Sequence, residues 1–134
     1  MHQGAIILMD IEHGEVIITV DKNIIIVKLE GAFNEFGAKK YTIGVKETID
    51  TFQGKPFSIL INNLEVLGGT PEAYEELEKY NQWLNTQNLT AKAMVISSIT
   101  TLDIINLLCP SRQSQQSKNF DNEEDALNWL KALS

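Results

Sequence analysis

The stretch "FSILINNLEVLGGTPEAYEELEKYNQWL", residues 57–84, contains two segments of different apolar periodicity. It opens with "FSILIN", a short apolar run of the kind found in a buried strand. After the glycine pair Gly68-Gly69 the apolar residues recur at intervals of three and four, the period of an amphipathic helix. The apolar line of this helix consists of Ala73, Leu77, Tyr80 and Leu84. The stretch therefore predicts one strand, a turn and one helix.

The same alternation extends in both directions. Upstream, "EVIITV" and "IIIVKLEG" predict two strands joined by the tight turn "DKN", and a helical period follows over residues 34–52. Downstream come a strand "AKAMVIS", a helix "TLDIINLLC" that Pro110 stops, and a brief edge strand near Asn119 and Phe120. In the closing helix "DNEEDALNWLKAL", Asp121 and Glu124 have the spacing of a capping box, with Asp121 as the N-cap.

The predicted order is β-β-α-β-α-β-α-β-α. Strands that alternate with helices favour an α/β domain with a mixed, mostly parallel sheet, which an antiparallel hairpin opens and four helices cover. A chain of 134 residues has the length of one domain. We expect a single domain over residues 13–134, with residues 1–12 as an N-terminal extension.

Charge and composition exclude several classes of binding partner and several cellular locations. The net charge is −7 and Arg112 is the only arginine, so neither nucleic acid nor an anionic membrane surface is expected to bind. The single cysteine, Cys109, rules out an internal disulfide and fits a reducing cytoplasm. The apolar runs are too short to cross a bilayer. We expect a cytoplasmic protein without a membrane span.

Three segments together resemble one fold family. "IIIVKLEGAFNEFGAKKY" is similar to the second strand and helix entry of SpoIIAA-like domains, the fold of the anti-sigma-factor antagonists (STAS domains). "FSILINNLEVLGGTPEAYEELEKYNQWL" resembles their next strand, switch loop and helix, and "FDNEEDALNWL" resembles their closing helix. The chain looks closer still to uncharacterised bacterial single-domain members, and CRAL-TRIO lipid-binding domains are similar in fold. Fold by itself does not establish function.

The resemblance directs attention to residues 65–70, which it places in the switch loop. Such antagonists carry an aspartate and a phosphorylatable serine there, and the matching positions hold Gly68 and Gly69. The resemblance therefore implies that the usual phosphoserine switch is absent. Thr70 suits a helix N-cap, with Pro71 at the first helical position and Glu72 in the first turn. The glycine amides could alternatively hold an anion at a helix start.

Polar residues gather where strands are expected to end. In open α/β sheets, ligands lie beyond the carboxyl ends of the strands. The candidate binding residues for a partner or ligand are Asn34, Asn62, Asn63, Gly68, Gly69, Thr70, Ser97 and Ser98. Each asparagine and serine could instead only cap a helix or complete a turn.

The segment "LDIINLL" carries more apolar residues than one buried stripe needs. We expect Leu102, Ile105 and Leu108 to form an apolar contact surface. A homodimer, another protein, the wall of an apolar pocket or burial between neighbouring elements would each use it.

Signals of catalysis are poor. His2 and His13 both lie near the N-terminus, no cysteine–histidine set has metal-binding spacing, and Cys109 has no evident histidine partner. We therefore expect no enzyme, no cofactor and no metal. The leading hypothesis is a regulatory module that binds a protein partner through residues 65–70 and the start of the next helix. The alternative is a module that binds a small apolar or lipid-like ligand, as the CRAL-TRIO likeness implies.

Overall fold

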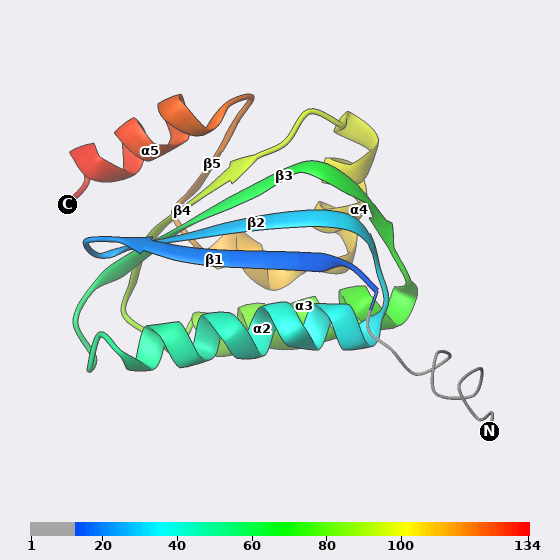
Figure 1. Cartoon of the computed structure of the whole chain (residues 1–134), viewed down its shortest axis with the longest axis horizontal. Coiled ribbons are helices and arrows are strands. Elements are labelled where there is room, and N and C mark those ends of the chain that lie inside the picture. Colours follow the sequence, from blue (N-terminus) through cyan, green and yellow to red (C-terminus); the bar gives the residue numbers. More distant parts are fainter. Residues whose placement is uncertain (1–12) are drawn as a thin grey trace, which may run out of the picture.

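The computed structural model describes residues 13–134, which form one five-stranded sheet covered by helices (Figure 1). The order of the described elements and the four α-helices agree with the prediction, and a short 3₁₀ helix, η1, is added. The predicted extension, residues 1–12, lies outside the described residues. The elements are β1 (Glu15–Asp21), β2 (Ile24–Phe33), α2 (Glu35–Asp50), β3 (Phe57–Gly69), α3 (Pro71–Leu84), β4 (Leu89–Val95), α4 (Ile99–Leu108), η1 (Pro110–Ser114), β5 (Ser117–Phe120) and α5 (Glu123–Ala132).

The strands lie side by side in chain order, β1-β2-β3-β4-β5. β1 pairs antiparallel with β2, and every later pair is parallel. The hairpin turn between β1 and β2 places Lys22 in the left-handed region, at φ 57°. This is the predicted mixed sheet opened by a hairpin. The carboxyl ends of β2, β3 and β4 consequently meet at one edge.

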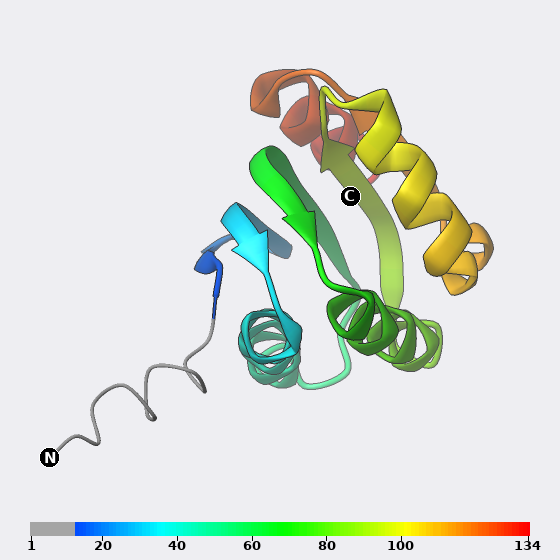
Figure 2. The same cartoon turned by 90° about the vertical axis from the view of Figure 1, so that its right-hand side faces the viewer.

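The two faces of the sheet have separate cores, because successive side chains of a strand point to opposite faces. Ile25, Val27 and Ile59 face the side that α2 and α3 cover. Ile24 and Leu60 face the other side, against Ala126 and Leu130 of α5. α4 packs beside α3 against Met94 of β4, on the α3 side, and Figure 2 shows α2, α3 and α4 wrapping that side.

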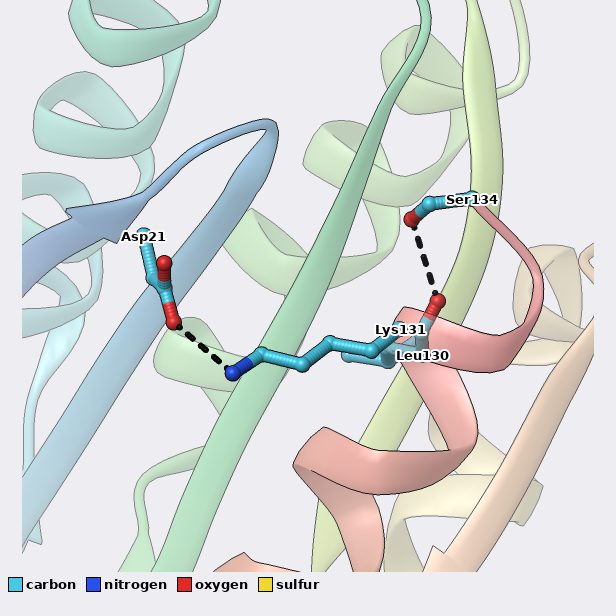
Figure 3. Close-up of polar contacts among 4 residues, drawn as sticks. All are labelled: Asp21, Leu130, Lys131 and Ser134. Carbon is cyan, nitrogen blue, oxygen red and sulfur yellow. Dashed lines mark hydrogen bonds and ion pairs between the residues drawn. The ribbon is translucent and has the colours of Figure 1, made fainter.

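α5 is attached to the sheet mainly by apolar burial. Ala126 and Leu130 are fully buried against β3 and β4. One ion pair, between Lys131 Nζ and Asp21 Oδ2 at 3.4 Å, reaches the β1–β2 hairpin (Figure 3). Its side chains are 51% and 38% exposed, so solvent screening leaves it little weight. In the same view Ser134 Oγ donates to the Leu130 carbonyl at 3.2 Å.

The predicted N-cap of α5 is wrong by one residue. Asn122 is the N-cap, and its Oδ1 accepts from the amide of Asp125 at 2.9 Å. The side chain of Asp121 instead accepts from Asn122 Nδ2. Two adjacent residues with capping side chains leave the start of the helix ambiguous in the sequence, and the path of the chain from β5 decides between them.

β3 is longer than expected. Residues 65–69 continue the strand, with Phe33 pairing with Gly69, so the predicted loop over residues 65–70 is wrong except at Thr70. The register with β2 shifts twice, next to Asn63 and next to Leu67. Each shift adds one residue to β3, and such bulges bend a strand and break its alternation. The broken alternation is why the sequence reads as a loop there.

No helix among the described residues is long and apolar enough to cross a membrane.

Candidate functional site

A cavity of about 70 Å³ lies between the α2–α3–α4 face of the sheet and the helices. Apolar side chains such as Leu29, Phe33, Val66 and Ile105 form most of its wall. Gly68 and Gly69 line the cavity at the end of β3, where Gly69 is exposed. The cavity thus lies at the carboxyl edge of the sheet, where ligands bind in open α/β folds.

The bulges of β3 help to form this cavity. Asn63 lies on the cavity side with Ile59 and Ile61 by the ordinary alternation of the strand, and the bulge after it brings Val66 to the same side. Asn62 points the other way and donates to Glu123 Oε2 at 2.6 Å. Gly68 has φ +128°, a conformation that other residues rarely adopt. A Cβ atom added to Gly69 would lie 3.3 Å from the ring of Tyr74. The glycine pair therefore lets the strand end bend close to α3.

Lys92 is a cation buried in the wall of the cavity. It is 2% exposed, and its Nζ donates to Asn81 Oδ1 at 2.8 Å and to Gln115 Oε1 at 3.4 Å. Neither partner carries a negative charge, and Lys92 has no ion pair with any residue in 13–134. Burial, together with repulsion by Arg112, lowers the pKa of the Lys92 ammonium to about 7. This lysine is therefore partly deprotonated at neutral pH.

Arg112 is a second buried cation on the same cavity. It is 7% exposed, and its Nη1 donates to Asn106 Oδ1 at 2.9 Å. Its Nη2 has only the thioether sulfur of Met94 at 4.0 Å, and its Nε has no hydrogen-bond partner within the described chain. Burial lowers the pKa of Arg112, but a guanidinium stays charged in proteins. Arg112 likewise has no ion pair to a described carboxylate.

Two tyrosines stand beside these cations. The rings of Tyr41 and Tyr80 meet edge to face at 5.3 Å between centroids, and Lys92 Nζ lies 5.7 Å from the Tyr80 ring centroid. Burial raises the pKa of Tyr41 to about 12 and that of Tyr80 well above its ordinary value. Tyr41 influences the Tyr80 hydroxyl electrostatically, but that hydroxyl lacks hydrogen-bond geometry to any described group. Both phenols therefore stay protonated and neutral.

Cys109 is a buried thiol of the same wall. It is 1% exposed, and its Sγ lies 3.9 Å from the carbonyl oxygen of Tyr74. Burial raises the pKa of this thiol to about 11, so the reactive thiolate is scarce at neutral pH. The arrangement does not favour a nucleophile.

The predicted binding residues are divided among three places. Asn63, Gly68 and Gly69 line the cavity, whereas Ser97 and Ser98 line a separate depression near Phe120. The other three have structural contacts: Asn34 caps α2 through the amide of Gly37, Thr70 caps α3 through the amide of Ala73, and Asn62 binds Glu123. Ser98 also caps α4 through the amide of Thr101. The set is not one site.

Of the three residues predicted to form an apolar contact surface, only Leu108 is exposed. Ile105 is 8% exposed and packs with Met94, Tyr74 and Cys109 in the core, with Leu102 partly buried beside them. Residues 102, 105 and 109 share one face of α4, and that face meets the sheet side. The exposed large apolar residues of the helix are Ile99, Ile104, Leu107 and Leu108, with exposed fractions of 76%, 39%, 77% and 41%. The polar residues Thr100, Asp103 and Asn106 are exposed beside them. We refer to the four apolar residues as the α4 apolar surface.

Lys92 and Arg112 are site residues that the sequence pattern did not predict. One signal was present for Lys92, because a lysine inside the apolar run "AKAMV" of a parallel strand must be buried on one face or the other. Arg112 follows a proline in a polar segment and reads as an exposed loop residue. Only the packing of η1 against α3 brings it to the cavity.

No protein-family model and no curated protein matches the chain. Several solved structures match it, and three of them match over most of their length. An uncharacterised protein of the DUF3478 family with a SpoIIAA-like fold, from Shewanella loihica PV-4, has a TM-score of 0.65 at 16% identity, covering 90% of this chain and 96% of that one. An anti-sigma factor antagonist from Mycobacterium paratuberculosis has a TM-score of 0.63 at 11% identity. This match covers 88% of this chain and 94% of that one.

The third structure is the anti-sigma factor antagonist SpoIIAA in its unphosphorylated form, with a TM-score of 0.62 at 12% identity, covering 87% of this chain and 98% of that one. Identities this low establish a likeness of fold alone. The five-stranded mixed sheet, the four helices and these three matches agree in architecture. The chain therefore has the SpoIIAA-like fold that its sequence resembles.

Proposed function

We propose that this protein is a non-catalytic regulatory module that binds a protein partner through the α4 apolar surface. The observation that carries the proposal is the exposure of Ile99 and Leu107, at 76% and 77%, on one helix of ten residues. Large apolar side chains that gather on one part of a protein surface often mark a site where another molecule binds. Two structures of the same fold are anti-sigma factor antagonists, named for an action on another protein.

Charge narrows the kind of partner. The net charge of −7 disfavours nucleic acids and anionic membranes, whose phosphates would be repelled. α4 itself carries one charged residue, Asp103. A protein with an apolar groove rimmed by basic residues would complement this surface. We further propose that binding needs no phosphorylation, because Gly68 and Gly69 provide no hydroxyl and Thr70 Oγ1 accepts from the amide of Ala73 at 3.1 Å.

The test compares variants for a partner that co-purifies from the native cell. Leu107→Lys should remove that partner, because a buried ammonium at an apolar interface is costly. Leu133→Lys is the matched control, since Leu133 is 37% exposed next to α5, which covers the other face of the sheet. Retention of the same partner by Leu107→Lys, or its loss with Leu133→Lys, would contradict the proposal.

A second candidate function is the binding of a small ligand in the cavity. It is favoured by the mostly apolar wall with its few polar groups, a composition common in ligand sites. A cavity of about 70 Å³ is roughly half the size of one that holds benzene. A long lipid chain therefore does not fit in it, and a ligand of a few non-hydrogen atoms does.

A further inference from the structure

The cavity has an imbalance of charge. Two cations, Lys92 and Arg112, line it, and both are more than nine-tenths buried. Neither forms an ion pair with a carboxylate in residues 13–134. Buried charges in proteins are ordinarily paired, because removing an ion from water is expensive. The two cations also repel each other: burial lowers the pKa of Lys92 most, and repulsion by Arg112 lowers it further.

Unused hydrogen-bond donors add to this imbalance. Within residues 13–134, Arg112 Nε has no hydrogen-bond partner, and Arg112 Nη2 has only a weak sulfur acceptor. These two nitrogens form one edge of the guanidinium plane, the edge that carboxylates bind with two parallel hydrogen bonds. The side chain of Asn63, which lines the cavity, makes no hydrogen bond of its own within the described chain. An acceptor with negative charge is what the site lacks.

The rest of the wall selects among anions. Leu29, Phe33, Val66 and Ile105 offer no hydrogen bonds, so a phosphate or sulfate would leave oxygens unsatisfied against them. A carboxylate concentrates its charge at one end and leaves an apolar remainder. The volume of about 70 Å³ limits that remainder to a few carbon atoms.

We propose that the cavity binds a short-chain monocarboxylate, with its carboxylate between Lys92 and Arg112 and its alkyl end against Phe33 and Val66. Entry is at the end of β3, where Gly69 is exposed and lines the cavity. The proposal specifies the second candidate function, and it does not involve the α4 apolar surface. The partner experiment and the ligand experiment can therefore fail separately.

The experiment is a titration followed by amide chemical shifts, with sodium acetate, propionate and butyrate as probes. Saturable shifts at Gly68 and Gly69 are expected for at least one carboxylate. Sodium chloride at the same ionic strength and propionamide, a neutral analogue of propionate, are the ligand controls. Absence of saturation with every carboxylate would overturn the proposal, and so would equal binding of chloride or propionamide.

Variants locate the site. Lys92→Met removes the buried charge at nearly constant size and should weaken the carboxylate at least about tenfold, the effect expected from losing a hydrogen bond to a charged group. Arg112→Met should do the same. Lys118→Met is the matched control, because Lys118 is exposed on β5 and pairs with Ala93, the neighbour of Lys92. Unchanged affinity in Lys92→Met, with its spectrum showing a folded chain, would place binding elsewhere and refute the assignment.

The pH dependence of affinity gives an independent readout. Lys92 is faced by Tyr80 and Asn81 of α3, by Gln115, and electrostatically by Cys109 and Arg112. The pKa of Cys109 is raised and Arg112 stays charged, so Lys92 is the group that titrates near neutrality. Because the anion binds the ammonium form, affinity should fall about tenfold from about pH 6 to about pH 8. A flat profile over this range would contradict the role of Lys92.

Discussion

The Nζ atom of Lys92 on β4 donates a hydrogen bond of 2.8 Å to Oδ1 of Asn81 on α3, and no described carboxylate completes an ion pair with it. Asn81 Oδ1 also accepts from Gln115 Nε2 at 3.1 Å. Two donors from β4 and from the segment after η1 thus share one neutral acceptor. A buried ammonium held in this way reduces the stability of the free protein.

Lys92→Met should therefore raise the free energy of unfolding, by about 1–4 kcal/mol at neutral pH. Methionine has nearly the length of lysine, and Asn81 Oδ1 keeps its bond from Gln115. Denaturant unfolding of both proteins measures the difference. A variant less stable than the parent would mean that the hydrogen bond to Asn81 outweighs the burial of the charge.

The pH dependence of the parent's stability follows from the same group. The pKa of Lys92 falls from 10.5 to about 7 on folding, so between these values the unfolded chain binds the proton more strongly. Stability should rise with pH across this window relative to Lys92→Met, with a slope of at most about 1.4 kcal/mol per pH unit. Below about pH 7 the difference between the two proteins should be constant. Parallel stability curves above pH 7 would contradict the lowered pKa.

Thr70→Ala should lower the free energy of unfolding by about 1 kcal/mol, because it removes the acceptor for the Ala73 amide. Thr70→Ser should be nearly silent, and Thr70→Asp should be tolerated because a carboxylate also caps and suits the positive end of α3. Thermal unfolding measures all three. If Thr70→Asp abolished partner binding while the fold stayed intact, and Thr70 carried stoichiometric phosphate in the native cell, a phosphoswitch would replace the capping role.

Glu78→Gln should loosen the contact between α3 and η1. Glu78 accepts from the amide of Ser111 at 3.0 Å and from its hydroxyl. Burial is the largest single effect and raises the pKa of Glu78, but the two bonds from Ser111 and the one from Gln82 together outweigh it and lower the pKa from 4.5. The stabilisation is present above that value and lost as pH falls through the lowered pKa. We expect at most about 1 kcal/mol, since the group is near solvent.

The measurement for Glu78 is unfolding of both proteins from neutral pH down into the acid range. The difference between them should shrink on acidification. If the difference in free energy of unfolding stayed constant as the pH fell, the shape of the Glu78 side chain, and not its charge, would account for its effect on stability.

Self-association should be weak and should use the α4 apolar surface. We predict a homodimer at high concentration, because Ile99 and Leu107 are uncovered in the single chain. Leu107→Lys should abolish it and change unfolding by no more than about 0.5 kcal/mol, as for other surface substitutions. Sedimentation that gives only a 15.0 kDa monomer for the parent at high concentration would contradict this prediction.

Much of the fold was predictable because periodicity is a local property. The apolar line Ala73, Leu77, Tyr80 and Leu84 predicts α3, and Thr70 followed by Pro71 predicts its start, as the structure confirms. The local apolar pattern did not predict the end of β3, where the pairing of β3 with β2 changes register. β3 has an extra residue next to Asn63 and another next to Leu67, so its last residues lose the strand period.

The site was less predictable because cavities and buried charges depend on packing between distant segments. Periodicity in "LDIINLL" indicated an apolar helix, but the orientation of α4 on the sheet decided that Ile105 is buried and Leu107 exposed. Likewise, Lys92 and Arg112 are separated in sequence and belong to different elements. The sequence by itself determined the order of the elements and the N-cap of α3, since these depend on neighbours along the chain. Only the tertiary structure brought two cations to one cavity that no carboxylate of residues 13–134 lines, because the packing of η1 and β4 against α3 places them there.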